Sequence, residues 1–197
     1  MPIAFMTAWH MLFSRGRLKA CETVLIHSAG SGVSHAAIQM AHRIGARVIA
    51  TSSSESKLSR ARDLGADEAI HYQDEDVKER VSDLTGGRGV DVIIDHNGQA
   101  TWETSIASLA KGGRLVICGV TQGAKVELDL GKFFYASQSI LGSTLGRPED
   151  LAQVIHLAAR GDVTPVIDRV FTLDQIQAAH QRMEDPQRFG KVVVEIS

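Results

Sequence analysis

The chain has 197 residues, of which 44% are hydrophobic, and its formal net charge at pH 7 is −2. This length supports one good core with an appendage and is too short for two full domains. Because neither a basic excess nor a run of like charges is present, the sequence excludes a protein built to neutralise nucleic-acid phosphates.

The apolar opening PIAFMTAWHMLF, residues 2–13, is predicted to be a helix in front of the first strand. It lacks a charged leading region and contains His10, so it does not have the pattern of a signal peptide. It is also too short to span a bilayer, which takes roughly 20 residues. The two cysteines, Cys21 and Cys118, lie far apart and outside any Cys/His cluster, so we expect free thiols, no structural zinc and a cytoplasmic protein.

Apolar stretches of strand length alternate with segments of helical period from residue 23 onward. The strands are continuous β-branched runs, which is typical of a sheet covered by helices on both faces. The alternation predicts an α/β fold: a doubly wound parallel sheet of the Rossmann type with about six strands. The expected strands cover residues 23–27, 46–51, 68–72, 90–95, 113–119 and 138–144, with helices over 32–44, KLSRARDL, VKERVSDL and TWETSIASLA.

The pattern changes after residue 145. EDLAQVIHLAARG predicts a helix that ends at Gly161, and PVIDRVF, LDQIQAAHQRM and KVVVEI predict strand, helix and strand. These last two strands have no obvious place in the sheet already counted. We therefore divide the chain into a Rossmann domain, residues 1–145 with its leading helix, and a C-terminal appendage, residues 146–197.

A glycine-rich turn, residues 28–34 (SAGSGVS), joins the first strand to the first helix of the sheet. Exposed amides and the positive dipole end at such a helix start can bind a diphosphate, provided that no bulky side chain blocks its approach. Gly30 and Gly32 provide the turn and the clearance. Ser34 replaces the third glycine, which normally serves helix–strand packing, and serine is small enough to keep that role. In this βαβ context the turn predicts a dinucleotide site rather than a purely structural bend.

The second strand ends in Ser52, Ser53 and Ser54, followed by Glu55 and Lys57. NAD-preferring sites usually place an acid at this strand end to hold the ribose 2′-hydroxyl. Hydroxyls and Lys57 suit a 2′-phosphate instead, so we expect NADP(H), with Glu55 counting against it. The alternative is that the serines cap the next helix and Lys57 is a solvated surface residue.

The fourth and fifth strands end in Asp95-His96-Asn97-Gly98 and Cys118-Gly119-Val120-Thr121. Ligands of open parallel sheets lie across these carboxyl ends. Small and polar residues there can approach the ribose and nicotinamide of a dinucleotide. Each stretch is also an ordinary strand-to-loop turn, and His96 is as compatible with a solvated loop histidine as with a catalytic one.

Together these features resemble the medium-chain dehydrogenase/reductase superfamily, in its quinone-oxidoreductase-like, zinc-binding alcohol dehydrogenase branch. The resemblance spans nearly the whole chain in family order and spacing. The phrases that carry it are FMTAWHML, ETVLIHSAGSGVSHAAIQMAHRIGARVIATSSSESKL, LGADEAIHY, LTGGRGVDVIIDHNG, SLAKGGRLVICG, SILGST and FGKVVV.

The resemblance implies a role for particular residues. The diphosphate should lie against Ser31, Gly32 and Val33, and the 2′-phosphate against Ser52, Ser53 and Lys57. Tyr72 should flank the adenosine, Asn97, Gly119 and Val120 should approach the nicotinamide ribose, and Thr7 should lie near the nicotinamide. Phe133 and Phe134 fall in a segment that borders the substrate cleft of such enzymes.

Two departures from the family matter. The N-terminal GroES-like catalytic domain of the family is absent from this sequence, and the last strands of the family return to that domain. Ile3 stands where members with catalytic zinc carry a cysteine ligand, so we expect no metal.

The resemblance implies hydride transfer from NADPH to a small carbonyl-conjugated molecule, a quinone or an α,β-unsaturated ketone. His96, Cys118 and Tyr135 are candidates for the general acid by position alone. Two alternatives stay open: an isolated nucleotide-binding module with little turnover, and a zinc-dependent alcohol dehydrogenase, against which Ile3 counts. An apolar edge strand at 138–144 predicts a homodimer, since an unpaired edge is a liability.

Overall fold

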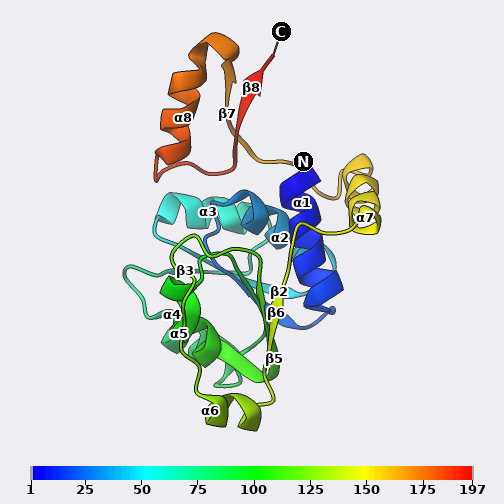
Figure 1. Cartoon of the computed structure of the whole chain (residues 1–197). Coiled ribbons are helices and arrows are strands. Elements are labelled where there is room, and N and C mark those ends of the chain that lie inside the picture. The colour runs from blue at the N-terminus through cyan, green and yellow to red at the C-terminus, as the bar shows by residue number, and fades with distance from the viewer. Residues whose placement is uncertain (1, 197) are drawn as a thin grey trace.

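A computed structural model that describes residues 2–196 contains a six-stranded parallel sheet with helices on both faces (Figure 1). The strand order is β3-β2-β1-β4-β5-β6, and all adjacent strands run parallel. This is the strand order of a doubly wound Rossmann sheet, so the predicted fold class is confirmed. The strands are β1 (Thr23–Ile26), β2 (Arg47–Ser52), β3 (Glu68–His71), β4 (Val90–Asp95), β5 (Leu109–Ile117) and β6 (Ser139–Gly142).

Two apolar clusters fill the spaces between this sheet and its helices. Val24 and Ile26 of β1 join the cluster under α1, α2 and α7, whereas Leu25 joins the cluster under α4 and α5. Both faces of β1 are therefore buried, which explains its continuous apolar run. The helices of these layers are α1 (Pro2–Trp9) with its π-helical continuation η1 (His10–Arg15), α2 (Gly32–Arg43), α3 (Glu55–Asp63), α4 (Val77–Thr85), α5 (Gln99–Ser108) and α7 (Pro148–Ala159). The short helix α6 (Leu130–Tyr135) has no buried residue and belongs to neither layer.

The fifth strand begins earlier than predicted. The helix expected through residue 110 ends at Ser108, and β5 starts at Leu109, which pairs with Val90. Gly112, which would lie just beyond the end of the expected helix, lies inside β5 with φ at 76°. The β4–β5 register shifts near this point, because the left-handed glycine lets the strand bend without losing its pairing.

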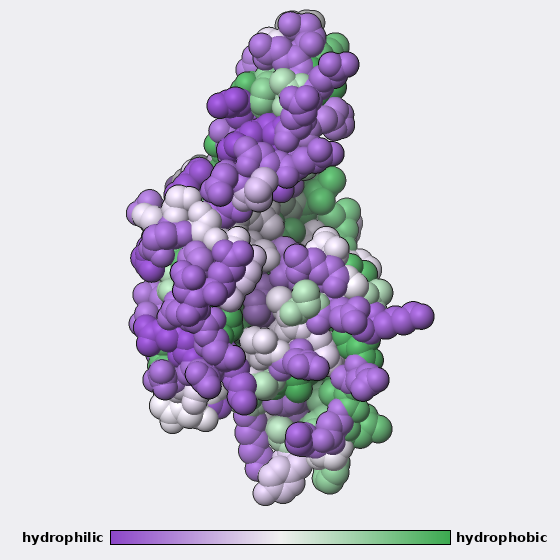
Figure 2. Space-filling model, turned by 90° about the vertical axis from the view of Figure 1, so that its left-hand side faces the viewer, coloured by the Kyte–Doolittle hydropathy of each residue, from purple (hydrophilic) through white to green (hydrophobic). Residues whose placement is uncertain are grey.

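The C-terminal residues 165–196, called the tail below, form a separate small unit. Strands β7 (Ile167–Thr172) and β8 (Lys191–Glu195) pair in parallel and are joined through the short 3-10 turn η2 (Leu173–Gln175) and α8 (Ile176–Glu184). The expectation that these strands stay outside the main sheet is confirmed. Figure 2 shows the tail as a narrower, largely hydrophilic lobe that projects from the rest of the molecule, called the body below (residues 2–164).

Among residues 2–196, none of the helices combines the length and the apolar character that a bilayer span requires.

Candidate functional site

The glycine-rich turn delivers the chain from β1 directly into α2. Ser31 is the N-cap residue, and its hydroxyl oxygen accepts a hydrogen bond from the Ser34 amide at 3.0 Å. The remaining amides of the first turn have no partner within the helix. They lie at the positive end of the helix dipole, so this corner favours an anion.

Ser34 keeps the packing role of the glycine that it replaces. Its side chain is fully buried, and its hydroxyl donates to the carbonyl oxygen of His27 at 2.7 Å. The hydroxyl also lies 2.8 Å from Ser31 Oγ. The side chain of residue 34 thus ties α2 to the end of β1 and is engaged within the helix–strand contact.

His96 supports the same corner from the end of β4. Its Nε2 atom lies 2.7 Å from Ser31 Oγ and 3.2 Å from Ser34 Oγ. Burial lowers the pKa of His96, although nearby Asp95 acts in the opposite direction. His96 is therefore a largely buried, neutral partner of the N-cap serine, which contradicts the solvated-loop interpretation.

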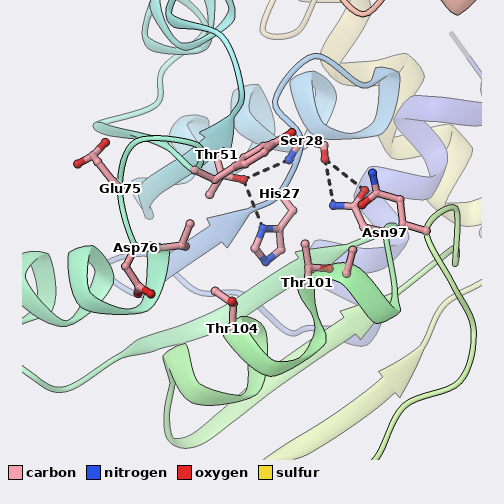
Figure 3. A pocket seen from close by; sticks show the side chains of 12 residues that line it. His27, Ser28, Thr51, Glu75, Asp76, Asn97, Thr101 and Thr104 are labelled. Atoms are coloured by element: carbon pink, nitrogen blue, oxygen red, sulfur yellow. Dashed lines mark hydrogen bonds between the residues drawn. The ribbon is translucent and has the colours of Figure 1, made fainter.

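A cavity of about 320 Å³ opens at the carboxyl ends of β1, β2, β3 and β4 (Figure 3). The ring of His27 points into it, and Thr101 and Thr104 reach toward that ring from α5. At its other end, Asn97 Nδ2 lies 3.0 Å from Ser28 Oγ, to which it donates. The cavity lies where doubly wound sheets bind ligands.

A buried carboxylate, Asp95, holds two residues that line this cavity, Asn97 and Thr101. Asp95 accepts hydrogen bonds from the Asn97 amide at 2.7 Å, from Thr101 Oγ1 at 2.6 Å and from Ser105 Oγ at 3.2 Å. His27 Nε2 lies 2.9 Å from the same Ser105 hydroxyl. Burial lowers the pKa of His27, partly offset by Asp95. A neutral histidine and a saturated carboxylate therefore fix the loop that carries Asn97.

A second cavity, of about 290 Å³, lies between the glycine-rich turn and the tail. Lys57 of α3 and Arg188 of the tail line it. Ser28 and Tyr72 line both cavities, so the two spaces adjoin. Together they form an elongated polar site from the ends of the strands to the start of α2.

The tail closes over the glycine-rich turn. The Gly190 amide donates to the carbonyl oxygen of Gly30 at 3.1 Å, and Lys57 Nζ donates to the carbonyl oxygen of Pro186. A Cβ atom on Gly32 would collide with Lys191 Cε and lie 2.8 Å from Lys191 Nζ. Glycine at position 32 therefore clears space for a lysine ammonium group beside the α2 amides.

Cations gather at this junction. Arg60 stacks 4.2 Å from the ring centroid of buried Phe189, and His35 lies under the same ring. Burial lowers the pKa of His35 to about 4, with Lys191, Arg60 and Arg188 adding to the effect. Within the described residues, neither Arg188 nor Lys191 has a carboxylate at ion-pair distance. The junction is thus electrostatically suited to an anion.

The end of β2 offers hydroxyl groups and no free acid. Ser52 is buried and Ser53 is half-buried. Ser54 occupies the N-cap position of α3 but makes no side-chain capping bond, so the capping alternative fails for its side chain. Glu55 is paired with Arg62 at 2.8 Å along α3. The acid that counted against a 2′-phosphate is therefore engaged elsewhere.

Seven of the predicted site residues line neither cavity: Thr7, Gly32, Val33, Ser52, Ser53, Gly119 and Val120. Thr7 is buried in α1 and donates to the Ile3 carbonyl at 2.8 Å, and Val33 packs against the core. Gly119 and Val120 follow β5, where a Cβ on Gly119 would lie 3.3 Å from the His96 carbonyl oxygen. Their proximity to a ligand stays a prediction.

The structure separates the remaining candidates from the cavities. Phe133, Phe134 and Tyr135 belong to α6, whose C-terminal Ala136 carbonyl accepts from Gly112 near the start of β5. They therefore lie at the opposite end of the sheet from the carboxyl ends and line neither cavity. Cys118 is half-buried, and burial raises its thiol pKa to about 11. No general acid emerges from these positions.

Sequence reasoning missed Lys191 and Arg188 as site residues. Both flank the phrase FG near the end of the chain, and both reach the glycine-rich turn from more than 150 positions away in the sequence. The available signal was the phrase FGKVVV, which carries part of the family resemblance. Lys191 lies within this phrase, and Arg188 directly precedes it. Sequence spacing alone could not show which part of the body they contact.

Comparison with known proteins gives a consistent set of relatives. The family model described as zinc-binding dehydrogenase matches residues 32–160. A quinone oxidoreductase of Pseudomonas aeruginosa is 34% identical over 96% of this chain and 61% of its own length. A zinc-type alcohol dehydrogenase-like protein of Schizosaccharomyces pombe is 32% identical over the whole chain and 58% of its own length.

Among solved structures, one described as an NAD-dependent alcohol dehydrogenase superimposes with a TM-score of 0.94 at 41% identity. It is covered over 57% of its length, and all of this chain is matched. The chain thus spans about three fifths of the length of these three relatives.

Proposed function

The chain belongs to the zinc-binding dehydrogenase family, and from that premise we propose that it is the coenzyme-binding part of an NADP(H)-dependent oxidoreductase. The observation that carries this proposal is the anion-suited corner where the α2 amides, Gly32 and Lys191 meet. The adjoining elongated cavities give an adenosine and its phosphates room beside that corner.

The residues present fit a dinucleotide. The amides of Gly32 and Val33 and the ammonium of Lys191 would hold the diphosphate beside Ser31, whose own amide donates to the Ser28 carbonyl oxygen at 2.9 Å. Tyr72, which lines both cavities and is 47% exposed, would flank the adenosine. When bound, the nicotinamide supplies the hydride. The chain's own residues orient that group, with Asn97 held rigidly by the Asp95 network and Gly119, Val120 and Thr7 proposed nearby.

The preference for NADP(H) over NAD(H) rests on the end of β2. Ser52, Ser53 and Lys57 offer donors to a 2′-phosphate, and the ion pair with Arg62 occupies Glu55. The solved relative described as NAD-dependent is an argument for the other coenzyme. Titration with both coenzymes, followed by nicotinamide fluorescence, decides between them.

Lys57→Ala is the sharpest single change for this preference. Loss of a charged hydrogen bond to the 2′-phosphate should weaken NADPH by about tenfold or more and leave NADH nearly unchanged. Equal losses for both coenzymes would contradict a role in 2′-phosphate binding. Tighter binding of NADH by the unaltered chain would overturn the preference itself.

For the substrate we propose a small carbonyl-conjugated acceptor, a quinone or an enone. The naming of relatives as quinone oxidoreductases supports this class. The competing function is a nucleotide-binding module with little turnover. NADPH-dependent reduction of a simple quinone separates the two. Turnover supports the reductase, and coenzyme binding without turnover supports the module.

A zinc-dependent alcohol dehydrogenase is the weaker alternative. Ile3 is 67% exposed at the start of α1 and has no atom that can ligate zinc. Activity that chelators abolish and zinc restores would favour this alternative.

We further propose a homodimer that forms through β6, the edge strand of the sheet. Edge strands present unpaired backbone groups that a second copy can satisfy. Light scattering at micromolar concentration should give twice the chain mass, and a monomer would contradict the proposal.

A further inference from the structure

Arg188 has a guanidinium group with few protein partners. It lies in the loop between α8 and β8, and its Nη1 atom donates to the Gly190 carbonyl oxygen at 2.7 Å. Its Nε atom is buried and has no partner among residues 2–196. An unsatisfied buried donor on a charged group is costly, so a built-in reason for it is expected.

The second cavity lies between Arg188 and the body. Arg188 and Lys57 line it together with Gly30 and Tyr72. Burial lowers the pKa of Lys57, and Arg188 is the strongest of the charges that lower it further. Two cations therefore converge on one cavity, where Lys57 Nζ donates to the Pro186 carbonyl and to no other acceptor among residues 2–196.

The neighbouring arginine of the tail provides a comparison. Arg182 makes two bonds to Asp168, one of 2.6 Å and one of 2.8 Å, and also donates to Asp185. This engagement holds the pKa of Asp168 down at about 2. Arg182 is thus neutralised inside the tail, whereas Arg188 is left for a different anion.

Among the described residues, the carboxylates that line this cavity form no ion pair with Arg188. Asp185 is occupied by Arg182 and by the Gln187 amide at 2.7 Å. Glu184 is exposed at the rim and makes no ion pair among the described residues. The positive groups that face the cavity therefore exceed the acids free to neutralise them.

We propose that Arg188 joins Lys57 in binding the coenzyme 2′-phosphate, which makes this tail residue a determinant of NADP(H) preference. The inference rests on the proposed function and adds a residue and a mechanism to it. A guanidinium group can bind two phosphate oxygens at once, and the lysine adds a point charge from the other side. The dianion would bridge the tail to α3, so the coenzyme itself would hold the two parts together.

Two small probes isolate this subsite. Adenosine 2′,5′-bisphosphate and adenosine 5′-monophosphate differ only in the 2′-phosphate, and calorimetry on the full chain needs no turnover. Arg188→Gln should weaken the bisphosphate by about 10- to 100-fold and leave the monophosphate nearly unchanged. Arg169→Gln is the matched control, because Arg169 is an exposed arginine of the same tail that lines neither cavity. It should change neither affinity.

Arg188→Lys guards against a folding artefact. It keeps the charge and loses the paired donors, so the loss for the bisphosphate should be intermediate. Equal weakening of both probes by Arg188→Gln, or no weakening of the bisphosphate, overturns the inference while the proposed function stands. If the unaltered chain binds neither probe, the proposed function fails and the inference fails with it.

Hydrogen exchange of β8 gives a second readout. NADPH should slow exchange in β8 more than NADH does, because only NADPH carries the bridging phosphate. Arg188→Gln should remove that difference. Equal protection by both coenzymes in the unaltered chain would contradict the bridge.

Discussion

The body and the tail are both built from βαβ units, yet they are stabilised in different ways. All four residues of β1 are buried, with helices over both faces. Of the six residues of β7, only Phe171 is buried. The tail keeps apolar side chains in contact with solvent, including Val170 and Ile176. The tail therefore lacks a core of its own and depends on the contacts that it makes at the glycine-rich turn.

Those contacts are few and belong to the proposed site. Phe189 is buried between Arg60 and His35, Gly190 bonds to the turn, and Lys191 lies against Gly32. A ligand that takes the positive charges of this junction would therefore stabilise the tail as well. The following predictions test that difference between the body and the tail.

The largest effect is expected from paired truncations, one in each region. Ile93→Ala in β4 removes a fully buried side chain and should lower the free energy of unfolding by about 2–5 kcal/mol. Val193→Ala in β8 removes a half-buried one and should cost less than about 1 kcal/mol. Urea denaturation followed by circular dichroism measures both. Similar costs would show that the tail has a core equivalent to that of the body.

The second effect is the pH dependence of the free energy of unfolding that His35 causes where the tail contacts the body. The pKa of His35 is lowered to about 4 from 6.5, so the unfolded chain takes up a proton at a higher pH than the folded chain does. The contribution of neutral His35 to the free energy of unfolding is therefore complete above pH 6.5. It is lost as the pH falls toward 4, and the total loss is on the order of 3 kcal/mol.

Replacement of His35 tests this pH dependence. His35→Leu should flatten the pH dependence of unfolding between pH 6.5 and 4, because no titrating group remains between Phe5 and Phe189. Urea unfolding of both proteins across that range is the measurement. An unchanged slope in the variant would exclude His35 as its source.

The third effect concerns the lysine that links tail and turn. Lys191→Ala should weaken NADPH and NADH by the same amount, about 2 kcal/mol, since the diphosphate is common to both. This contrasts with Lys57→Ala, which should affect NADPH alone. Fluorescence titration of both variants makes the comparison, and a selective loss of NADPH in Lys191→Ala would place its ammonium at the other phosphate.

The smallest effect belongs to a residue wholly inside the body. Ser34→Ala removes the bond to the His27 carbonyl and should cost about 1 kcal/mol of unfolding free energy. Coenzyme affinity should stay the same, because that hydroxyl is engaged within the helix–strand contact. Thermal unfolding and an NADPH titration report the two quantities, and weakened binding without loss of stability would reverse this assignment.

The body was predictable from sequence because its signals are local. Strand runs such as VDVIID (residues 90–95) and the turn at Gly30 and Gly32 carry their meaning within a few residues. The start of β5 was mispredicted because apolar residues such as Leu109 and Ala110 fit a buried helix end as well as a buried strand. Gly112 likewise fits a helix end as well as a bend in a strand.

The junction was not predictable because its contacts join distant segments. No residue close to Gly32 in the sequence indicates that the absence of a side chain there makes room for Lys191. Likewise, the hydroxyl partners of His96 become visible only when β4 lies beside β1. The family resemblance supplied the site around the turn but assigned no role to the tail.

A crystal structure of the chain soaked in excess NADPH would show whether the start of α2 holds the diphosphate of the coenzyme. We expect the diphosphate beside Ser31, on the amides of Gly32 and Val33, with Lys191 Nζ next to it. Bound coenzyme elsewhere on the protein, with this corner free of phosphate, would contradict it.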